Sequence, residues 1–368
     1  MNFRKLRIKV ISMINKIRFY VNAYKHCKYV KNQIKDGYYY EGSDEEYETV
    51  VVSYWKKLTG GKFIPKKYWY QYFGYKLQKF DPRIIPMDLF QKEIMPYLNE
   101  FAFQPTLENK IYFDYIMHDI KKPKIFIKYV NGFLMNGENE FIDFTELENI
   151  IKEQKELIIK PIDLEKGTGV KKLKISENYE ESLNEIKRRM DNQEFIIQEF
   201  ITQSPQISKF NPSSVNTIRV ISLLINNRVE ILSAILRVGA TGLDVDNYDK
   251  GGDCRSIDKD GKLDGYLIHR GKISTLDRYG NPVEKVEIIG FDKVVKEIKK
   301  IHPRIPHLRW IGWDFAIDQN YEPVFIELNG FAGEDQAVCG PIFGDITEEF
   351  ITELFENRHK KRFERADV

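Results

Sequence analysis

Three polar residues lie within two short apolar runs near the end of the chain. Residues 312–330 read GWDFAIDQNYEPVFIELNG, and Asp314, Glu327 and Asn329 lie in runs that otherwise have the composition of β-strands. Residues 318–323, between the runs, contain Asp, Asn and Pro, which favour a turn. We therefore predict a β-hairpin that carries polar side chains on one of its faces.

The pairing of the two strands decides which polar side chains meet. A symmetric loop pairs Ile317 with Val324 and Asp314 with Glu327, and two-residue alternation puts Asn329 on the face of Glu327. Carboxylates directly opposite each other repel, because their Cβ atoms lie only about 5 Å apart. A divalent cation would relieve this repulsion, and carboxylate and amide oxygens are the hard ligands that Mg²⁺ takes. The alternative is an exposed acidic face on an edge hairpin.

A lysine followed by a glycine-bearing loop is the second candidate. The apolar run ELIIKP ends with Lys160 and Pro161. The loop after it contains Glu165, Lys166, Gly167, Thr168 and Gly169. Glycines let backbone N–H groups approach a phosphate closely, and a lysine at a strand end can neutralise phosphate charge. The P-loop pattern is absent. A plain hairpin turn is the alternative interpretation.

An arginine and a glycine-containing segment complete the candidates. Arg219 lies in the apolar run NTIRVISLLI, where a charged side chain needs a partner. That partner is either a carboxylate in a structural salt bridge or a bound anion. Asn247, Gly251 and Gly252 indicate a loop that can approach a ligand.

Short strand-like runs dominate the chain from about residue 106 and must position these residues. They are KIFIKYV, ELIIKP, VKKLKI, EFIIQEFI, TIRVISLLI and RVEILSAILRV. A helix-like stretch lies among them at residues 178–190. This order predicts an α+β fold with mostly antiparallel strands. Residues 41–105 are rich in aromatic residues and interrupted by prolines, which indicates a compact lead-in of short helices.

The first 35 residues carry ten basic residues and no acidic ones. An apolar stripe recurs at helical spacing among them, formed by Leu6, Val10, Met13, Ile17 and Val21. This pattern predicts a basic amphipathic helix. Such a helix either lies on an anionic membrane surface or packs on the protein's own core with a solvated basic face.

Composition excludes several classes of protein. The 57 basic and 55 acidic residues give a net charge of +2, which argues against a nucleic-acid partner. Cys27, Cys254 and Cys339 are far apart and predict neither disulfides nor a cysteine zinc site, so we expect a reducing cytoplasm. We also expect no signal peptide and no membrane span.

Taken in order, the strand lysine, glycine loop, Gln-Glu-Phe-Ile, apolar-strand arginine and Asp…Glu-x-Asn hairpin resemble the ATP-grasp superfamily. The stretches SVNTIRV, DNYDKGG and GWDFAIDQNYEPVFIELN, followed by Gln336, are similar to its branch associated with sugar transfer and polysaccharide biosynthesis. The resemblance covers residues 106–345. This sequence departs from the wider superfamily in two places. It has a single compact Gly-Thr-Gly where many members have more glycine, and it has Gln203 and Gln206 where a ribose-binding acid is expected.

The resemblance implies an ATP-grasp fold, in which two α+β subdomains clasp the nucleotide between antiparallel sheets. Residues 1–40 would form the basic helix and 41–105 the helical lead-in. Residues 106–200 would form the N-terminal subdomain with the glycine loop, and 201–368 the C-terminal subdomain with the metal site.

The resemblance also implies a role for each matching residue. ATP would be bound by Lys110, Lys160, Glu165, Lys166, Gly167, Thr168, Gly169, Gln198, Glu199, Phe200 and Ile201. Two Mg²⁺ ions would be held by Asp314, Glu327 and Asn329. Catalysis would depend on Arg219 and Lys160. Substrate would contact Arg237, Asn247, Gly251, Gly252, Arg255 and Gln336.

The implied activity is an ATP- and Mg²⁺-dependent carboxylate–amine ligase that forms an amide through an acyl phosphate. Its substrates would be an amino acid or amine and a sugar carboxylate in capsule or surface polysaccharide biosynthesis. The alternatives are a phosphotransferase acting on a sugar hydroxyl and a non-catalytic nucleotide-binding scaffold for glycosyltransferases. We expect a cytoplasmic protein, peripheral at the inner face of the plasma membrane through residues 1–35, with glycosyltransferases as further partners.

Overall fold

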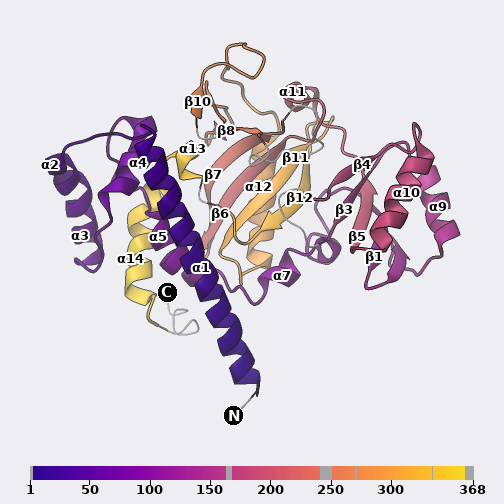
Figure 1. Cartoon of the computed structure of the whole chain (residues 1–368), viewed down its shortest axis with the longest axis horizontal. Coiled ribbons are helices and arrows are strands. Elements are labelled where there is room, and N and C mark those ends of the chain that lie inside the picture. Colours follow the sequence, from indigo (N-terminus) through magenta and orange to yellow (C-terminus); the bar gives the residue numbers. More distant parts are fainter. Residues whose placement is uncertain (1–2, 163–167, 241–250, 270–271, 334, 361–368) are drawn as a thin grey trace.

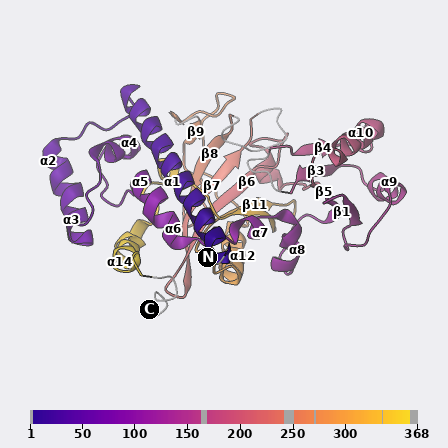
Figure 2. The same cartoon turned by 60° about the horizontal axis from the view of Figure 1, so that its bottom comes forward.

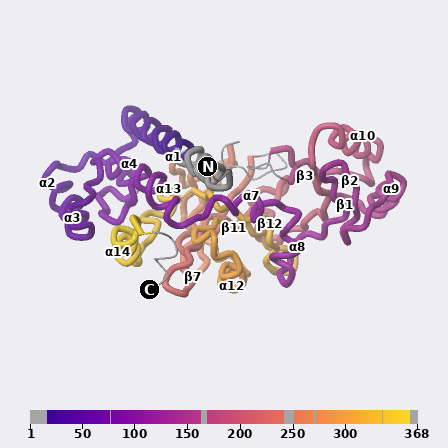
Figure 3. The backbone as a smooth tube through the Cα atoms, turned by 90° about the horizontal axis from the view of Figure 1, so that it is seen from below, coloured from indigo at the N-terminus to yellow at the C-terminus, as the bar shows by residue number. Residues whose placement is uncertain are grey.

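Three parts of the molecule lie in a row along its long axis: a helical N-terminal region, a central sheet and a smaller sheet (Figure 1). The computed structural model describes residues 3–162, 168–240, 251–269, 272–333 and 335–360, and only the backbone of residues 3–16 and of residue 76. The central sheet lies between the other two parts in the turned views as well (Figure 2 and Figure 3). The predicted α+β class with antiparallel sheets is confirmed.

The N-terminal region is helical, as predicted. Its elements are α1 (Phe3–Lys35), α2 (Asp44–Glu46), η1 (Tyr47–Val52), α3 (Ser53–Thr59), α4 (Lys67–Leu77), α5 (Met87–Leu89), η2 (Phe90–Ile94), α6 (Met95–Leu98), α7 (Gln104–Leu107), η3 (Lys110–Tyr112) and α8 (Phe113–Ile116). Its aromatic residues form a core: Trp55, Trp69 and Tyr70 are fully buried in a cluster that includes Trp310 of the central sheet. These aromatic residues therefore anchor the helical region to the central sheet.

Helix α1 packs on this core through a different face from the predicted stripe. Phe19, Ala23 and Val30 are buried, whereas Ile17 and Val21 are 56% and 45% exposed. The side chains of the other stripe residues, at positions 6, 10 and 13, lie outside the described residues. One face of α1 therefore packs on the protein's own core, as one interpretation predicts. Another face is exposed, which leaves room for the contact with an anionic membrane surface that the other interpretation predicts.

The smaller sheet has the strand order β2-β1-β5-β3-β4, with antiparallel neighbours throughout. Its strands are β1 (Ile125–Val130), β2 (Phe133–Asn136), β3 (Leu157–Pro161), β4 (Lys171–Leu173) and β5 (Phe195–Glu199). Helices α9 (Phe144–Lys152) and α10 (Tyr179–Met190) cover one face, where Leu147 and Ile186 pack against Ile159 and Ile197. The opposite face, which carries Lys160, remains available to the central sheet.

The central sheet has the order β10-β9-β8-β7-β6-β11-β12 and is also antiparallel. Its strands are β6 (Thr217–Ile225), β7 (Arg228–Val238), β8 (Asp253–Ile257), β9 (Leu267–His269), β10 (Lys272–Ser274), β11 (Trp310–Ile317) and β12 (Pro323–Asn329). Helix α12 (Phe291–Ile301), followed by η5 (His302–Arg304), buries Val294 and Ile298 against one face. The other face meets the N-terminal core, α13 (Gln336–Cys339), η6 (Gly344–Ile346) and α14 (Thr347–Asn357).

Two chain crossings connect the sheets along the β11–β12 hairpin. The first leads into β1, and along it the Phe325 N–H donates to the Lys121 carbonyl at 2.9 Å. The second follows β5 and leads to α11 (Pro205–Ser208), with the Ser204 N–H donating to the Ile317 carbonyl at 2.9 Å. Backbone hydrogen bonds therefore fix both crossings to the hairpin that carries the predicted metal ligands.

Candidate active site

The β11–β12 hairpin brings the predicted carboxylates together by a different register from the predicted one. Asp314 pairs with Glu327, as predicted. The prediction that Ile317 pairs with Val324 is wrong, because Ile317 pairs with Pro323. A bulge beside Asp314 inserts one extra residue in β12 and restores the carboxylate pair. The one-residue difference between the predicted and the observed pairing at the turn is therefore removed by the bulge, before the strands reach Asp314 and Glu327.

The polar residues of this hairpin share one face of the central sheet. Trp313, Phe325 and Leu328 belong to the apolar core under α12. Alternation along the strands therefore turns Asp314 and Glu327 to the opposite face, with Asn329 beyond Glu327. This face is the one that the smaller sheet and α13 approach.

Arginines compensate the buried carboxylate of Asp314. Arg219 of the neighbouring strand β6 donates from Nε to Oδ1 at 2.5 Å and from a terminal nitrogen to Oδ2 at 2.7 Å. Arg237 of β7 lies 3.3 Å from Oδ2. Burial would raise the pKa of Asp314, but Arg219 and Arg237 hold it below its ordinary value. The repulsion that we expected a divalent cation to relieve is therefore relieved in part by guanidinium groups, and Arg219 forms a salt bridge with a carboxylate.

Lysines from both sides of the site converge on Glu327. Lys110, at the start of η3, has its Nζ 3.8 Å from Glu327 Oε2. Lys160 lies at the end of β3 in the smaller sheet and is 6% exposed. Burial and the positive charge of Lys110 lower the pKa of Lys160 to about 7, against an opposing effect of Glu327. The cluster therefore contains a lysine that can lose or gain its proton near neutral pH.

The position of Asn329 is fixed by the residue that follows it. The Gly330 N–H donates to Glu108, and its carbonyl accepts from Asn99 Nδ2 at 2.6 Å. Asn99 also bonds to both backbone groups of Trp310, at 2.7 and 2.9 Å. The Asn329 Nδ2 is buried and has no hydrogen-bond partner among the residues that the structure describes. An unpaired buried amide costs stability, so this group is suited to contact a ligand.

The predicted nucleotide hinge lies where β5 leaves the smaller sheet. Gln198 is buried and pairs with Ile158, and the Glu199 N–H donates to the Lys124 carbonyl at 2.8 Å. The ring of Phe200 stacks under Lys172, whose Nζ lies 3.9 Å from the ring centroid. Ile201 begins the crossing to the central sheet.

Only part of the predicted glycine loop can be placed. Thr168 and Gly169 are exposed just before β4. Gly169 has a φ of +74°, a backbone conformation that glycine adopts more readily than residues with a Cβ atom. Glu165, Lys166 and Gly167 lie outside the described residues. The predicted role of this loop therefore stays a prediction.

The predicted substrate residues are not all in one place. Arg237 is in the cluster around Asp314. Arg255 pairs with Leu236 and stacks on Phe210, so it faces the α12 side of the sheet, away from that cluster. It also donates to the Asp264 carbonyl at 2.5 Å. A direct role for Arg255 at this site does not agree with its position.

The side chain of Gln336 is bound to the N-terminal region. Its Nε2 donates to the Ile85 carbonyl at 2.9 Å, and its Oε1 accepts from the Ile85 N–H at 2.8 Å. Only 2% of the residue is exposed. The predicted substrate contact of Gln336 is therefore replaced here by an anchor between α13 and the helical lead-in.

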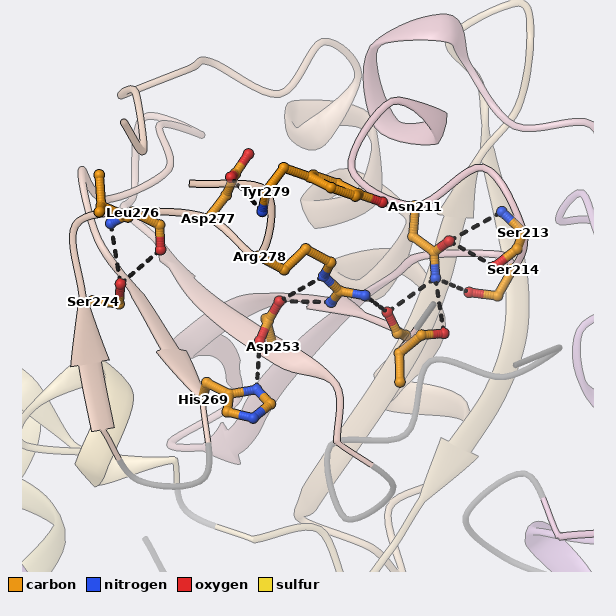
Figure 4. A network of polar contacts seen from close by, with 12 residues as sticks. Asn211, Ser213, Ser214, Asp253, His269, Ser274, Leu276, Asp277, Arg278 and Tyr279 are labelled. Carbon is orange, nitrogen blue, oxygen red and sulfur yellow. Dashed lines mark hydrogen bonds and ion pairs between the residues drawn. The ribbon is translucent and has the colours of Figure 1, made fainter. Parts of the chain in front are cut away.

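A polar network holds the chain on both sides of residues 241–250, which include Asn247 and lie outside the described residues (Figure 4). Asn211 and Arg278 donate to the Gly239 carbonyl at 2.9 and 2.7 Å. Arg278 also binds Asp253 at 2.6 Å, and Asp253 contacts His269. Gly251 and Gly252 directly precede Asp253. The predicted ligand loop thus starts and ends at fixed points.

Two charged residues near the site were not among the predicted site residues. Lys128 of β1 and Lys160 of β3 pair with opposite sides of Ile196, so they share one face of the smaller sheet. Lys128 is 1% exposed and bonds to Asn139 Oδ1 at 2.8 Å. Burial raises the pKa of Asp335 to about 6, although Arg219 favours its ionised form. Lys128 could have been selected from the sequence, because it is a lysine within an apolar strand-like run. The burial of Asp335 depends on tertiary packing, so the local sequence does not indicate it.

The donor set fits Mg²⁺ if the amide takes part. Within the described residues, no group of three or more His, Cys, Asp and Glu is placed to hold a metal ion. Asp314 and Glu327 supply two carboxylates, and the unpaired Asn329 amide can turn its oxygen toward a ligand. Each carboxylate oxygen of Asp314 can accept a further bond beside Arg219. The residues present therefore match a hard divalent cation.

Comparisons with known proteins agree with this geometry at the family level. A model of the sugar-transfer-associated ATP-grasp family matches residues 89–335. It begins earlier than the predicted residue 106 and ends before 345. No sequence among the curated proteins compared matches the chain.

Several solved structures align with the chain at low similarity. L-amino acid ligase from Bacillus licheniformis is 14% identical, with a TM-score of 0.36 over 69% of this chain and 48% of that chain. N5-carboxyaminoimidazole synthase from Aspergillus clavatus is 10% identical, with a TM-score of 0.39 over 63% and 47%. The ATP-grasp ligase PsnB is 15% identical, with a TM-score of 0.40 over 73% and 68%. The alignments thus span about half the length of the first two.

The family match covers about two thirds of the sequence and includes the smaller sheet, β6–β8 and the β11–β12 hairpin. It therefore includes Lys110 and Lys160, the Arg219–Asp314 salt bridge, and Glu327 with Asn329. This chain belongs to the sugar-transfer-associated ATP-grasp family.

Proposed function

We propose that this chain is an ATP- and Mg²⁺-dependent carboxylate–amine ligase that forms an amide through an acyl phosphate. The observation that carries the proposal is the meeting of charges from both sheets. The charges of Lys110 and Glu327 both act on the pKa of Lys160 in the smaller sheet. Glu327 in turn pairs with Asp314 on the central sheet. This meeting of charges supports a site for a triphosphate and its metal ion between the two sheets.

The chain's residues would act by positioning and charge. Lys110 and Lys160 would neutralise phosphate oxygens, and burial makes that attraction stronger than it is in water. Mg²⁺, held by Asp314, Glu327 and Asn329, would supply further neutralisation of the triphosphate. Phosphoryl transfer needs little covalent help from a protein, so the lack of a protein nucleophile in the proposal is consistent with this chemistry.

The arginines favour an anionic substrate next to the phosphates. Arg219 and Arg237 place two guanidinium groups against Asp314, on the face that Glu327 shares. In the proposed reaction, a substrate carboxylate oxygen attacks the γ-phosphorus and the bond to ADP breaks. An amine nitrogen then attacks the acyl carbon, phosphate leaves, and the amine loses a proton to solvent. The guanidinium groups of Arg219 and Arg237 would attract the carboxylate and stabilise the acyl phosphate.

The test is ADP release from ATP and Mg²⁺ with pools of uronic acids and amino acids. Release that requires both an acid and an amine, with amide as product, supports the ligase. We expect Glu327→Gln to lower the rate by about 10²-fold or more, because it removes a carboxylate from the set that would hold Mg²⁺. Glu322→Gln is the matched control: Glu322 lies in the same hairpin but pairs with Lys293 at the surface.

Two other results would overturn the ligase. Release of ADP with neutral sugars alone, giving a phosphorylated sugar, would establish a phosphotransferase. Tight ATP binding without turnover in every pool would favour a nucleotide-binding scaffold.

We also propose the biological setting from the family's association with sugar transfer. The substrates would be a sugar-linked carboxylate and an amino acid or amine in capsule or surface polysaccharide assembly, beside glycosyltransferases at the inner face of the plasma membrane. Within the described residues, no helix is long and apolar enough to cross a membrane.

A further inference from the structure

Helix α1 has two apolar faces, and the body of the protein covers only one. Phe19, Ala23 and Val30 are buried against the N-terminal core. On another face, Ile17, Tyr20, Val21 and Tyr24 are exposed by 56%, 60%, 45% and 70%. These four residues, the α1 stripe, follow helical spacing and form a continuous row.

The spacing of the stripe continues toward the N-terminus in the sequence. Leu6, Val10 and Met13 precede Ile17 at intervals of three and four residues. The α-helix begins at Phe3, so these positions fall on the same side of the helix as Ile17 and Val21. The sequence pattern and the exposed stripe therefore describe one apolar row along α1.

The charge of α1 differs sharply from that of the rest of the chain. Ten of the 57 basic residues and none of the 55 acidic residues lie in positions 1–35, so residues 36–368 carry 47 basic and 55 acidic residues and a formal charge of −8. Lys25 and Lys28 are exposed beside the stripe. Lys92 adds to this side, with its Nζ 5.1 Å from the Tyr20 ring centroid. An acidic body with one strongly basic helix is oriented by an anionic surface.

We propose that the α1 stripe and its flanking lysines dock the protein on an anionic lipid bilayer. The apolar side chains would enter the boundary between headgroups and acyl chains, and the lysines would contact the headgroups. Tyrosine suits this boundary, because its ring is apolar and its hydroxyl is polar. A second copy of the chain is less well matched, because two such basic helices would repel each other.

Docking would place the site close to the membrane. The opposite side of α1 contacts the segment that follows the predicted metal ligands: the Phe19 and Phe331 rings lie 5.5 Å apart, and Arg18 lies 4.7 Å above the Phe331 ring. Phe331 comes two residues after Asn329. This inference rests on the proposed function only for the choice of the cytoplasmic leaflet, since lipid binding itself needs no catalysis.

The test is flotation of the full chain with vesicles, without ATP or substrates. We expect binding to vesicles that contain phosphatidylglycerol and little to phosphatidylcholine alone. Replacing Lys25 and Lys28 by Gln should weaken binding by about fivefold for each lysine. Because this contribution is electrostatic, high salt should weaken binding as well.

A triple variant tests the apolar part of the surface. Ile17→Ser, Val21→Ser and Tyr24→Ser together should weaken binding by at least about tenfold. The matched control changes Ile273, Leu276 and Tyr279 to Ser, because these residues are similarly exposed, at 42%, 50% and 59%, but lie far from α1 in the sequence. Surface substitutions are preferable to deleting residues 1–35, because the deletion would also remove Phe19, Ala23 and Val30 from the core.

Three outcomes would overturn the proposal. They are failure of the unaltered chain to float with anionic vesicles, equal loss in the control variant, and a wild-type dimer in sedimentation that the stripe variant alone converts to monomer. ADP release is measured separately without lipid, so loss of the proposed activity and loss of membrane binding can be told apart.

Discussion

Lys160 should take up a proton when ATP binds. Its pKa is lowered to about 7, first by burial and then by Lys110. At pH 8, about 0.9 of the Lys160 side chains would therefore be neutral before binding. A triphosphate beside the lysine favours the charged form and moves the pKa back toward its ordinary value. Each binding event at this pH should then take about 0.9 proton from the buffer.

The sign of the pH effect on affinity follows from this linkage. Because the bound state holds more protons than the free state above pH 7, ATP affinity should fall as the pH rises, by up to about tenfold for each pH unit. Isothermal titration calorimetry measures the proton count directly. The observed heat is compared between two buffers that differ in their heat of ionisation.

Lys160→Arg is the matched variant. Arginine keeps the positive charge and cannot lose its proton in this pH range. The variant should bind ATP without the proton uptake of the wild type, and proton changes of the nucleotide itself cancel in the comparison. Equal uptake in both proteins, or none in the wild type, would refute the reasoning that Lys160 is a partly neutral lysine at the phosphate site.

Three further predictions concern stability. Asn99→Ala removes three buried hydrogen bonds and should lower the unfolding free energy in urea by about 2–4 kcal/mol. The exposed control Asn192→Ala should change this free energy by less than about 0.5 kcal/mol. A change that small in Asn99→Ala would contradict the prediction. Gly312→Ala would place a Cβ 2.4 Å from the Ala332 Cβ and should lower the melting temperature and the rate of ADP release together; an unchanged melting temperature would argue against the close packing. Burial lowers the pKa of His302 to about 4 in the folded protein. As the pH falls, His302 therefore becomes protonated in the unfolded chain before it does in the folded one. About 3 kcal/mol of stability should be lost between pH 6.5 and about pH 4. Urea unfolding of His302→Gln should lack this part of the pH dependence, and an unchanged pH dependence would count against it.

Elements that depend only on neighbouring residues were predictable from the local sequence. All six strand-like runs form strands, because dense β-branched residues such as those in TIRVISLLI favour a buried extended chain. Helix α10 begins after Asn178, whose side chain accepts from the Glu181 N–H as a helix cap. A similar signal for α9, the capping box of Asp143 and Glu146, was present but overlooked. Strands β2, β9 and β10 have only three or four residues, too few for a clear pattern.

The sequence also contained most of the site chemistry, since Asp314, Glu327, Asn329, Lys160 and Arg219 could be selected by residue type and alternation. What it left open was the partner of each charge. Whether Arg219 meets a carboxylate or a ligand depends on which strand lies beside β6, and the structure places Asp314 there.

The remaining assignments depend on contacts between segments far apart in the sequence. Gln336 bonds to Ile85, 251 residues away in the sequence. Arg255 faces away from the site because of its strand register, and the core covers the Phe19 face of α1 and leaves Ile17 exposed. Local pattern specifies that a residue lies on one side of a helix or strand. Which side is covered depends on the packing of distant segments, and that packing is set by shape and buried area summed over the whole chain.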